Sequence, residues 1–319
     1  MKKYIVLGLM LPLSAYAEKK IESIIPHQNI PAAVKDIRSF ENESRYGVYI
    51  HSTNCSFEIL INDIPVIKYS DTSGSGLAGS YFPLNEGINN KGTQRVTIKM
   101  TPGFNKEQNA LNTQFSPDSG IKMKIVKSLK NKTGSLEEND VQSYSTFKKK
   151  MGSDNTFEGS FTFFADIPYH IETLENAEVL QTTDQDKLQA IEQEVVAKYN
   201  KIRSIYTNGS WSALANIYYN REKRIAKQLY LLPDEIKERW NHEYVFRTNT
   251  DVAFFDVKPI ENYKITFYAA GKIVCLQRVN DEKSALWGDF KRKGKDNVMT
   301  TYITLYLYRP KGTSSLEVY

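Results

Sequence analysis

The sequence of 319 residues predicts an α+β protein with two domains, an antiparallel β-sandwich followed by a helix-led domain with its own antiparallel sheet. Three patterns predict this class. Segments with apolar residues at every second position fill residues 45–165, helical periodicity runs from 184 to about 240, and alternation then returns up to the C-terminus. We expect a signal peptide at 1–17, the sandwich at 18–168, a linker at 169–183 and the second domain at 184–319.

The first seventeen residues have the pattern of a secretory signal peptide. Lys2 and Lys3 precede a short apolar core, and Ala15-Tyr16-Ala17 is a small-x-small cleavage site. Cleavage after Ala17 is expected, and the pattern is typical of bacteria, so we predict a periplasmic or secreted protein. No later segment has the roughly 18 consecutive apolar residues of a membrane helix, so no membrane span is expected.

Strands with one apolar face predict the sandwich. The segment GTQRVTIKMTP places Val96, Ile98 and Met100 on one face and polar residues on the other. RYGVYIHS, SFEILIND, GIKMKIVKSL and NTFEGSFTFFADIPY alternate in the same way, and Asn62-Asp63 is a hairpin turn. About seven short strands without a long helix favour an antiparallel sandwich.

The run FEILINDIPVIKY…YFPLNEGINNKGTQRVTIKMTP, residues 57–102, resembles the accessory, carbohydrate-binding-like β-sandwich modules of bacterial glycosidases. The likeness lies in a strand that ends in an Asn turn and in the spacing of the turns after it. It implies a jelly-roll-like accessory fold. No ligand-contacting position of such modules can be matched, so no binding residue is carried over.

The second domain begins where the period becomes helical. One helical face, capped by Thr183 or Asp184, carries Leu188, Ile191, Val195, Tyr199, Ile202 and Tyr206. After the break TNGS, a second amphipathic helix carries Trp211, Leu214, Ala215, Tyr218, Ile225 and Leu229. Pro233 opens a short third helix. From Tyr244 the chain returns to strands, with Gly271 in a hairpin turn.

This order of elements over 184–319 resembles the NTF2-like fold, whose curved sheet wraps around its helices and often leaves a pocket. Enzymes of that family place an acid/base pair of Asp, His or Tyr inside the cone. No such pair can be matched here, so the catalytically silent members are the closer comparison.

No pattern indicates a catalytic residue, a cofactor or a metal. Gly74, Gly76 and Gly79 have the G-x-G-x-x-G spacing, but Pro83 and Gly87 follow where a nucleotide-binding helix is required, so we interpret the motif as a flexible turn. The four histidines have no metal-ligand spacing. The net charge of +5 falls to +3 when the two lysines of the signal peptide are removed, which is too little to favour nucleic acid.

The two cysteines, Cys55 and Cys275, leave two alternatives open. Export permits a disulfide, which would join the two domains. The other alternative is a pair of separate buried thiols.

Tyrosines supply the candidate ligand-binding residues. In TTYITLYLYRP, Ile303, Leu305 and Leu307 share one strand face, and the other face carries Tyr302, Thr304, Tyr306 and Tyr308. The strand is therefore either covered on both sides or lines a cavity, and we name Tyr302, Tyr306 and Tyr308 as candidates.

A basic stripe marks the second helix. Arg221, Arg224 and Lys227 recur every three residues. We interpret them as a solvated helix face beside Glu222, with an acidic partner as the alternative.

Together these patterns predict an exported, non-catalytic binding protein of the bacterial cell envelope. Its expected partner is a protein or a glycan, and one specific version is an immunity protein against a toxin delivered to the periplasm. The alternative is an envelope hydrolase or isomerase that uses a pocket of the C-terminal domain.

Overall fold

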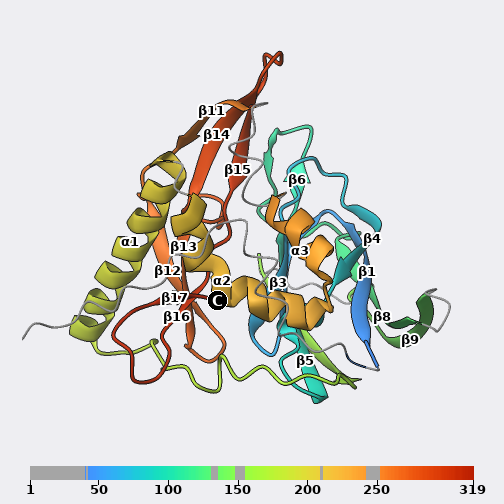
Figure 1. Cartoon of the computed structure of the whole chain (residues 1–319). Helices are drawn as coiled ribbons and strands as arrows, with labels where there is room; N and C mark the ends of the chain where they lie inside the picture. Colours follow the sequence, from blue (N-terminus) through green and yellow to red (C-terminus); the bar gives the residue numbers. More distant parts are fainter. Residues whose placement is uncertain (1–39, 41, 131–135, 148–154, 209–210, 242–251) are drawn as a thin grey trace, which may run out of the picture.

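The computed structural model (Figure 1) describes residues 40, 42–130, 136–147, 155–208, 211–241 and 252–319. These residues form a mixed α+β structure in which three α-helices accompany sheets whose strands pair antiparallel. The α+β class predicted from the sequence is thereby confirmed. The segment predicted to be a signal peptide, residues 1–17, and the segment around Tyr244 lie outside the described residues.

The first half of the structure, residues 45–168, contains two four-stranded sheets. The first has the order β4-β1-β8-β9, formed by Leu77–Pro83, Arg45–Thr53, Gly120–Lys130 and Leu136–Ser145. The second has the order β10-β5-β2-β3, formed by Phe157–Ala165, Gly92–Pro102, Cys55–Ile61 and Ile64–Tyr69. A short ribbon pairs β6 (Phe104–Asn105) with β7 (Ala110–Leu111).

Both sheets bury their apolar faces in one cluster. Val48 and Ile121 come from the first sheet, and Val96, Ile98 and Met100 come from the second. The predicted inward face of β5 is therefore buried, because alternation along a strand places every second side chain on the same side.

Two predicted turns are present in this half. Asn62 and Asp63 both have positive φ angles, as a tight hairpin between β2 and β3 requires. Gly74 and Gly76 of the glycine motif lie in the loop between β3 and β4, where Asp71 Oδ1 accepts hydrogen bonds from the backbone N–H groups of Ser73 and Gly74. Gly79 lies within β4, so a strand and not a helix follows the loop, which agrees with the interpretation of the motif as a turn.

The second half, residues 184–319, starts with α1 (Gln185–Asn208), α2 (Trp211–Leu229) and α3 (Pro233–Trp240). The predicted face of α1 is buried at Val195, Tyr199, Ile202 and Tyr206. A three-stranded sheet follows, in the order β11-β14-β15, formed by Val252–Val257, Trp287–Arg292 and Val298–Tyr302. A four-stranded sheet has the order β12-β13-β16-β17, formed by Tyr263–Tyr268, Ile273–Arg278, Leu307–Tyr308 and Glu317–Val318.

The strand predicted over residues 300–310 is interrupted. It pairs with β14 up to Tyr302 and with β13 only from Leu307, so the chain passes from one sheet to the other between them. The buried Tyr199 hydroxyl stabilises this passage because it donates to the Leu305 carbonyl at 2.6 Å and accepts from the Leu276 N–H at 2.9 Å. The apolar residues of the predicted face remain buried as expected: Ile303, Leu305 and Leu307.

The central segment, residues 169–183, is packed between the two halves. Its backbone bonds to the second half, from Leu180 N–H to the Gly271 carbonyl and from Glu178 N–H to the Arg309 carbonyl. Its buried side chains are Tyr169, Ile171, Leu174, Ala177 and Leu180. The segment expected to be a linker therefore contributes to the packing, and the predicted domain boundaries stay a prediction.

Apolar side chains of the two halves also pack against one another. Leu60 and Ile64 of the first half share a cluster with Tyr268 and Ile273 of the second half. Tyr230, which follows α2, lies in the core cluster of the first half and donates its hydroxyl to the Ser44 carbonyl. Contacts of this kind hold the walls of the site described next at fixed positions.

Candidate functional site

A cavity of about 460 Å³ lies between the two halves, and we call it the central cavity. The first half contributes strand β3 and the segment around the 3₁₀ turn η3 (Asn85–Gly87). The second half contributes α1, α2, α3 and the interrupted strand segment. The side chains used below are Lys68 and Glu86 from the first half, and Arg221, Arg224, Arg239, Tyr302, Thr304, Tyr306 and Tyr319 from the second.

Two of the three residues of the basic stripe of α2, Arg221 and Arg224, face this cavity. Arg224 has a relative exposure of only 8%, and the side chain of Arg221 is 18% exposed. Lys227 donates to the His170 carbonyl of the central segment. The interpretation as a solvated helix face is therefore wrong, because the first half and the central segment cover the side of α2 that the sequence assigns to water.

Arg224 is held in place from two sides. Its Nη1 donates to Gln228 Oε1 at 2.7 Å, and its guanidinium lies 3.9 Å from the centre of the Tyr319 ring. The Gln228 amide nitrogen in turn lies 3.3 Å from the Ile88 carbonyl and 3.1 Å from Asn89 Oδ1, on the segment after η3. A single glutamine thus fixes the arginine and also joins α2 to the first half.

Arg224 has no carboxylate partner among the residues that the structure describes, and its buried Nε has no hydrogen-bond partner there. The neighbouring arginines differ, because Glu222 binds both of them. Its carboxylate oxygens lie 3.5 Å from Arg221 Nη1 and 3.0 Å from Arg239 Nε, and its side chain is 2% exposed. Glu222 therefore ties α3 to α2 and neutralises one charge of that pair.

Two of the three candidate tyrosines line the cavity. Tyr302 and Tyr306 are partly buried and belong to its wall. Tyr308 is 7% exposed, lies in the cluster shared by the two halves and donates its hydroxyl to Glu317 at 3.0 Å. Tyr308 is separated from the other two because the strand that would have aligned all three is interrupted between Tyr302 and Leu307. Ligand binding by these residues stays a prediction.

Tyr302 and Tyr306 remain protonated at neutral pH. Burial raises the pKa of Tyr306 well above its usual value, and the charge of Arg221 only partly opposes this effect. Burial also raises the pKa of Tyr302. Both phenols are therefore neutral groups that can donate a hydrogen bond or offer a ring face, and neither is suited to act as a base.

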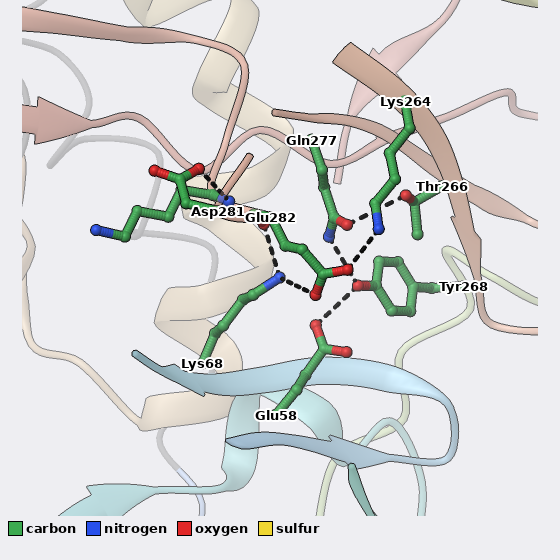
Figure 2. Close-up of polar contacts among 9 residues, drawn as sticks. Glu58, Lys68, Lys264, Thr266, Tyr268, Gln277, Asp281 and Glu282 are labelled. Carbon is green, nitrogen blue, oxygen red and sulfur yellow. Dashed lines mark hydrogen bonds and ion pairs between the residues drawn. The ribbon is translucent and has the colours of Figure 1, made fainter. Parts of the chain in front are cut away.

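A polar network beside the cavity joins strands of the two halves, as Figure 2 shows. The Tyr268 hydroxyl donates to Glu58 at 2.7 Å and accepts from Gln277. Lys68 Nζ, on β3, donates to the Glu282 carbonyl at 2.7 Å.

The same lysine also lines the cavity, so this network helps to position a basic group in the wall. Lys264 forms an ion pair with Glu282 and thereby holds that carboxylate in the network. The hydrogen bond from Lys264 is the main cause that lowers the pKa of Glu282.

The two cysteines are free thiols that lie in different apolar clusters. Burial raises the pKa of Cys55 and of Cys275 to about 12. Of the two alternatives left open by the sequence, the structure has the separate buried thiols, and the disulfide between Cys55 and Cys275 is not formed in it.

The residues that the structure describes contain no group of three or more His, Cys, Asp or Glu side chains arranged to hold a metal ion. None of their helices is long and apolar enough to cross a membrane.

Sequence reasoning identified the arginines but assigned them to the wrong environment. It missed Gln228 and Tyr319, which contact Asn89 of the first half, and it named Glu222 only as a charge beside a solvated face and not as the partner of Arg239 on α3. The sequence offered one usable signal, a glutamate inside a basic helical stripe. No protein-family model, curated protein or solved structure matches this chain.

Proposed function

We propose that the chain is an exported, non-catalytic binding protein of the bacterial cell envelope, and that it recognises a protein or a glycan through the central cavity. The observation that carries this proposal is the position of Tyr302 and Tyr306 in the wall of a cavity of about 460 Å³. Ligand sites are typically concavities of roughly 300–1,000 Å³ with aromatic walls and a few convergent polar groups.

The fold assignments that belong to this proposal are an antiparallel β-sandwich and an NTF2-like domain. Two four-stranded sheets with a shared core support the first assignment. Three helices followed by antiparallel strands support the second. In the second half a large apolar cluster fills the space between helices and sheets, and it includes Tyr199, Leu214 and Leu276. Such a filled interior favours binding at the edge of this half over binding inside it.

The immunity-protein version requires only export and a recognition surface. The other candidate, an envelope hydrolase or isomerase, requires two facing ionisable groups that can exchange a proton near neutral pH. Among the described residues of the cavity wall, Glu86 is the one carboxylate. No specific observation therefore favours the enzyme.

Export is tested by N-terminal sequencing of the protein recovered from the periplasm or the medium of an expressing bacterium. We expect the mature chain to begin at Glu18. A product that retains Met1 would contradict the proposed location.

Recognition is tested with an array of bacterial envelope glycans and, in parallel, with affinity capture from a periplasmic extract. Loss of a partly buried aromatic contact is expected to weaken binding of the captured partner about 30-fold in Tyr302→Ala, as at other aromatic hot spots. Phe164→Ala is the matched control, because Phe164 is 57% exposed and lies outside the described cavity wall. Equal binding by both variants and the unaltered chain would rule out the cavity as the recognition site.

A further inference from the structure

We propose that the central cavity binds an anionic sugar, and that the carboxylate or phosphate of this ligand lies against Arg224 and Arg221. This inference rests on the proposed function in that it uses the same cavity. It adds the chemical class of the ligand.

The first argument is the charge of the cavity wall. Its described residues include four basic side chains, Lys68, Arg221, Arg224 and Arg239, and one carboxylate, Glu86. The buried Glu222 behind the wall compensates one further charge, because it pairs with Arg221 and Arg239. Lys68 Nζ lies 3.9 Å from Glu282 Oε2, so this lysine also has a carboxylate neighbour, although the Glu282 side chain is half exposed. Arg224 remains as the cation that no described carboxylate pairs.

The second argument is the cost of such an arrangement. A buried charge is normally paired, because its removal from water is unfavourable unless a counter-charge compensates it. Arg224 is 92% buried, yet its described contacts are a neutral amide and an aromatic ring. Its Nε donor is buried without a partner. An anionic ligand would supply both the missing charge and the missing acceptor.

The third argument is the rigidity of this group. Gln228 fixes one nitrogen of the guanidinium, and the Tyr319 ring covers one of its faces. A planar guanidinium that is already oriented suits carboxylate and phosphate oxygens, which it binds through paired N–H groups. Pre-orientation also lowers the entropic cost of binding.

The tyrosines explain why the anion is expected to be carried by a sugar. Tyr302 and Tyr306 supply ring surface and neutral hydroxyl groups in the same cavity as the arginines. Aromatic side chains with a polar end suit ligands that combine an apolar face with hydroxyl groups. The exposed Thr304 adds a further hydroxyl group to the wall.

The test is isothermal titration calorimetry of the full mature chain with three probes: D-glucuronate, glucose 1-phosphate and neutral glucose, at constant ionic strength. We expect saturable binding of glucuronate or of glucose 1-phosphate and no heat of binding with glucose. The anion that binds more tightly distinguishes an acidic sugar from a phosphorylated one, and either result supports the proposal.

Two variants and one control locate the binding. Arg221→Gln is expected to weaken anion binding at least about tenfold, as the loss of a charge-assisted hydrogen bond does. Arg224→Lys keeps the charge but loses the planar fork, and a similar loss is expected. Lys223→Gln removes the same charge from an exposed position of α2 and should stay within about twofold of the unaltered chain.

Circular dichroism of each variant shows whether it is folded, and Arg221→Gln tests the proposal even where Arg224→Lys fails to fold. Absence of saturable binding of either anion to the unaltered chain would overturn the inference, as would unchanged binding in Arg221→Gln. An envelope partner whose binding depends on Tyr302 but is not reduced by either anion would overturn it as well, while the proposed function would stand.

Discussion

Tyr308→Ala tests whether this side chain is part of the packing between the halves or part of a binding surface. Tyr308 is 7% exposed, and its ring meets Tyr319 edge to face with 6.1 Å between the ring centres. Its hydroxyl donates to Glu317, which also accepts from Asn220. The structure therefore assigns Tyr308 to the core, whereas Tyr302 is only partly buried against Trp287.

The expected losses follow from these environments. Truncation of Tyr308 to Ala removes a side chain that buries about 150 Å² of surface. At about 25 cal/mol per Å², this loss lowers the free energy of unfolding by about 4 kcal/mol. This value lies within the usual range of about 3–5 kcal/mol for aromatic core truncations. Tyr308→Phe removes only the hydrogen bond and is expected to cost about 1 kcal/mol. Tyr302→Ala is expected to cost about 1 kcal/mol, because the Tyr302 side chain is only partly buried.

The assay is equilibrium urea unfolding of the three variants and the unaltered chain, followed by circular dichroism and by tryptophan fluorescence. Comparable slopes are required for the free energies to be compared. A loss below about 1.5 kcal/mol for Tyr308→Ala, or equal losses for the two Ala variants, would refute the assignment of Tyr308 to the core.

Three further predictions concern the packing of the chain. Cys55 and Cys275 should not react with a thiol reagent in the native protein and should both react after unfolding, because burial raises the pKa of each to about 12; reaction of native thiols within minutes would contradict this. Ala270→Gly should raise the free energy of unfolding by about 0.5 kcal/mol, because Ala270 has a φ angle of 52°, a left-handed conformation that glycine adopts more readily than alanine. A lower free energy of unfolding in a urea titration would contradict this prediction. Residues 169–183 should resist limited proteolysis, because their buried side chains hold the segment in place. If mass spectrometry of the fragments shows early cleavage within 169–183, the segment is a free linker.

The sequence predicted the elements that depend on local patterns. The buried faces of β5 and α1 follow from periods of two and 3.6 residues, and both are present. The Asn62-Asp63 hairpin follows from residues that tolerate positive φ angles. These features depend only on residues that are close in the sequence and on the burial of one face of the helix or strand.

The site depends on contacts that local patterns do not contain. Whether the arginines of α2 face water or another part of the chain depends on how the halves dock, and Gln228 meets Ile88 across 140 positions. The interruption after Tyr302 requires the hydroxyl of Tyr199, more than a hundred positions earlier in the chain. For this reason the tyrosines could be named as candidates, while their separation into two environments could not be predicted.

The central claim is that the ligand occupies the cavity between the halves, and a substitution that fills this cavity tests it most directly. Thr304 is exposed and lines the cavity, so Thr304→Trp adds an indole without removal of a core contact. Thr101→Trp, on the exposed face of β5, is the control. Calorimetric titration with glucuronate and glucose 1-phosphate should show at least a tenfold weaker binding for Thr304→Trp, equivalent to about 1.4 kcal/mol, and unchanged binding for the control. Unchanged binding by a folded Thr304→Trp variant would place the ligand elsewhere and contradict the account.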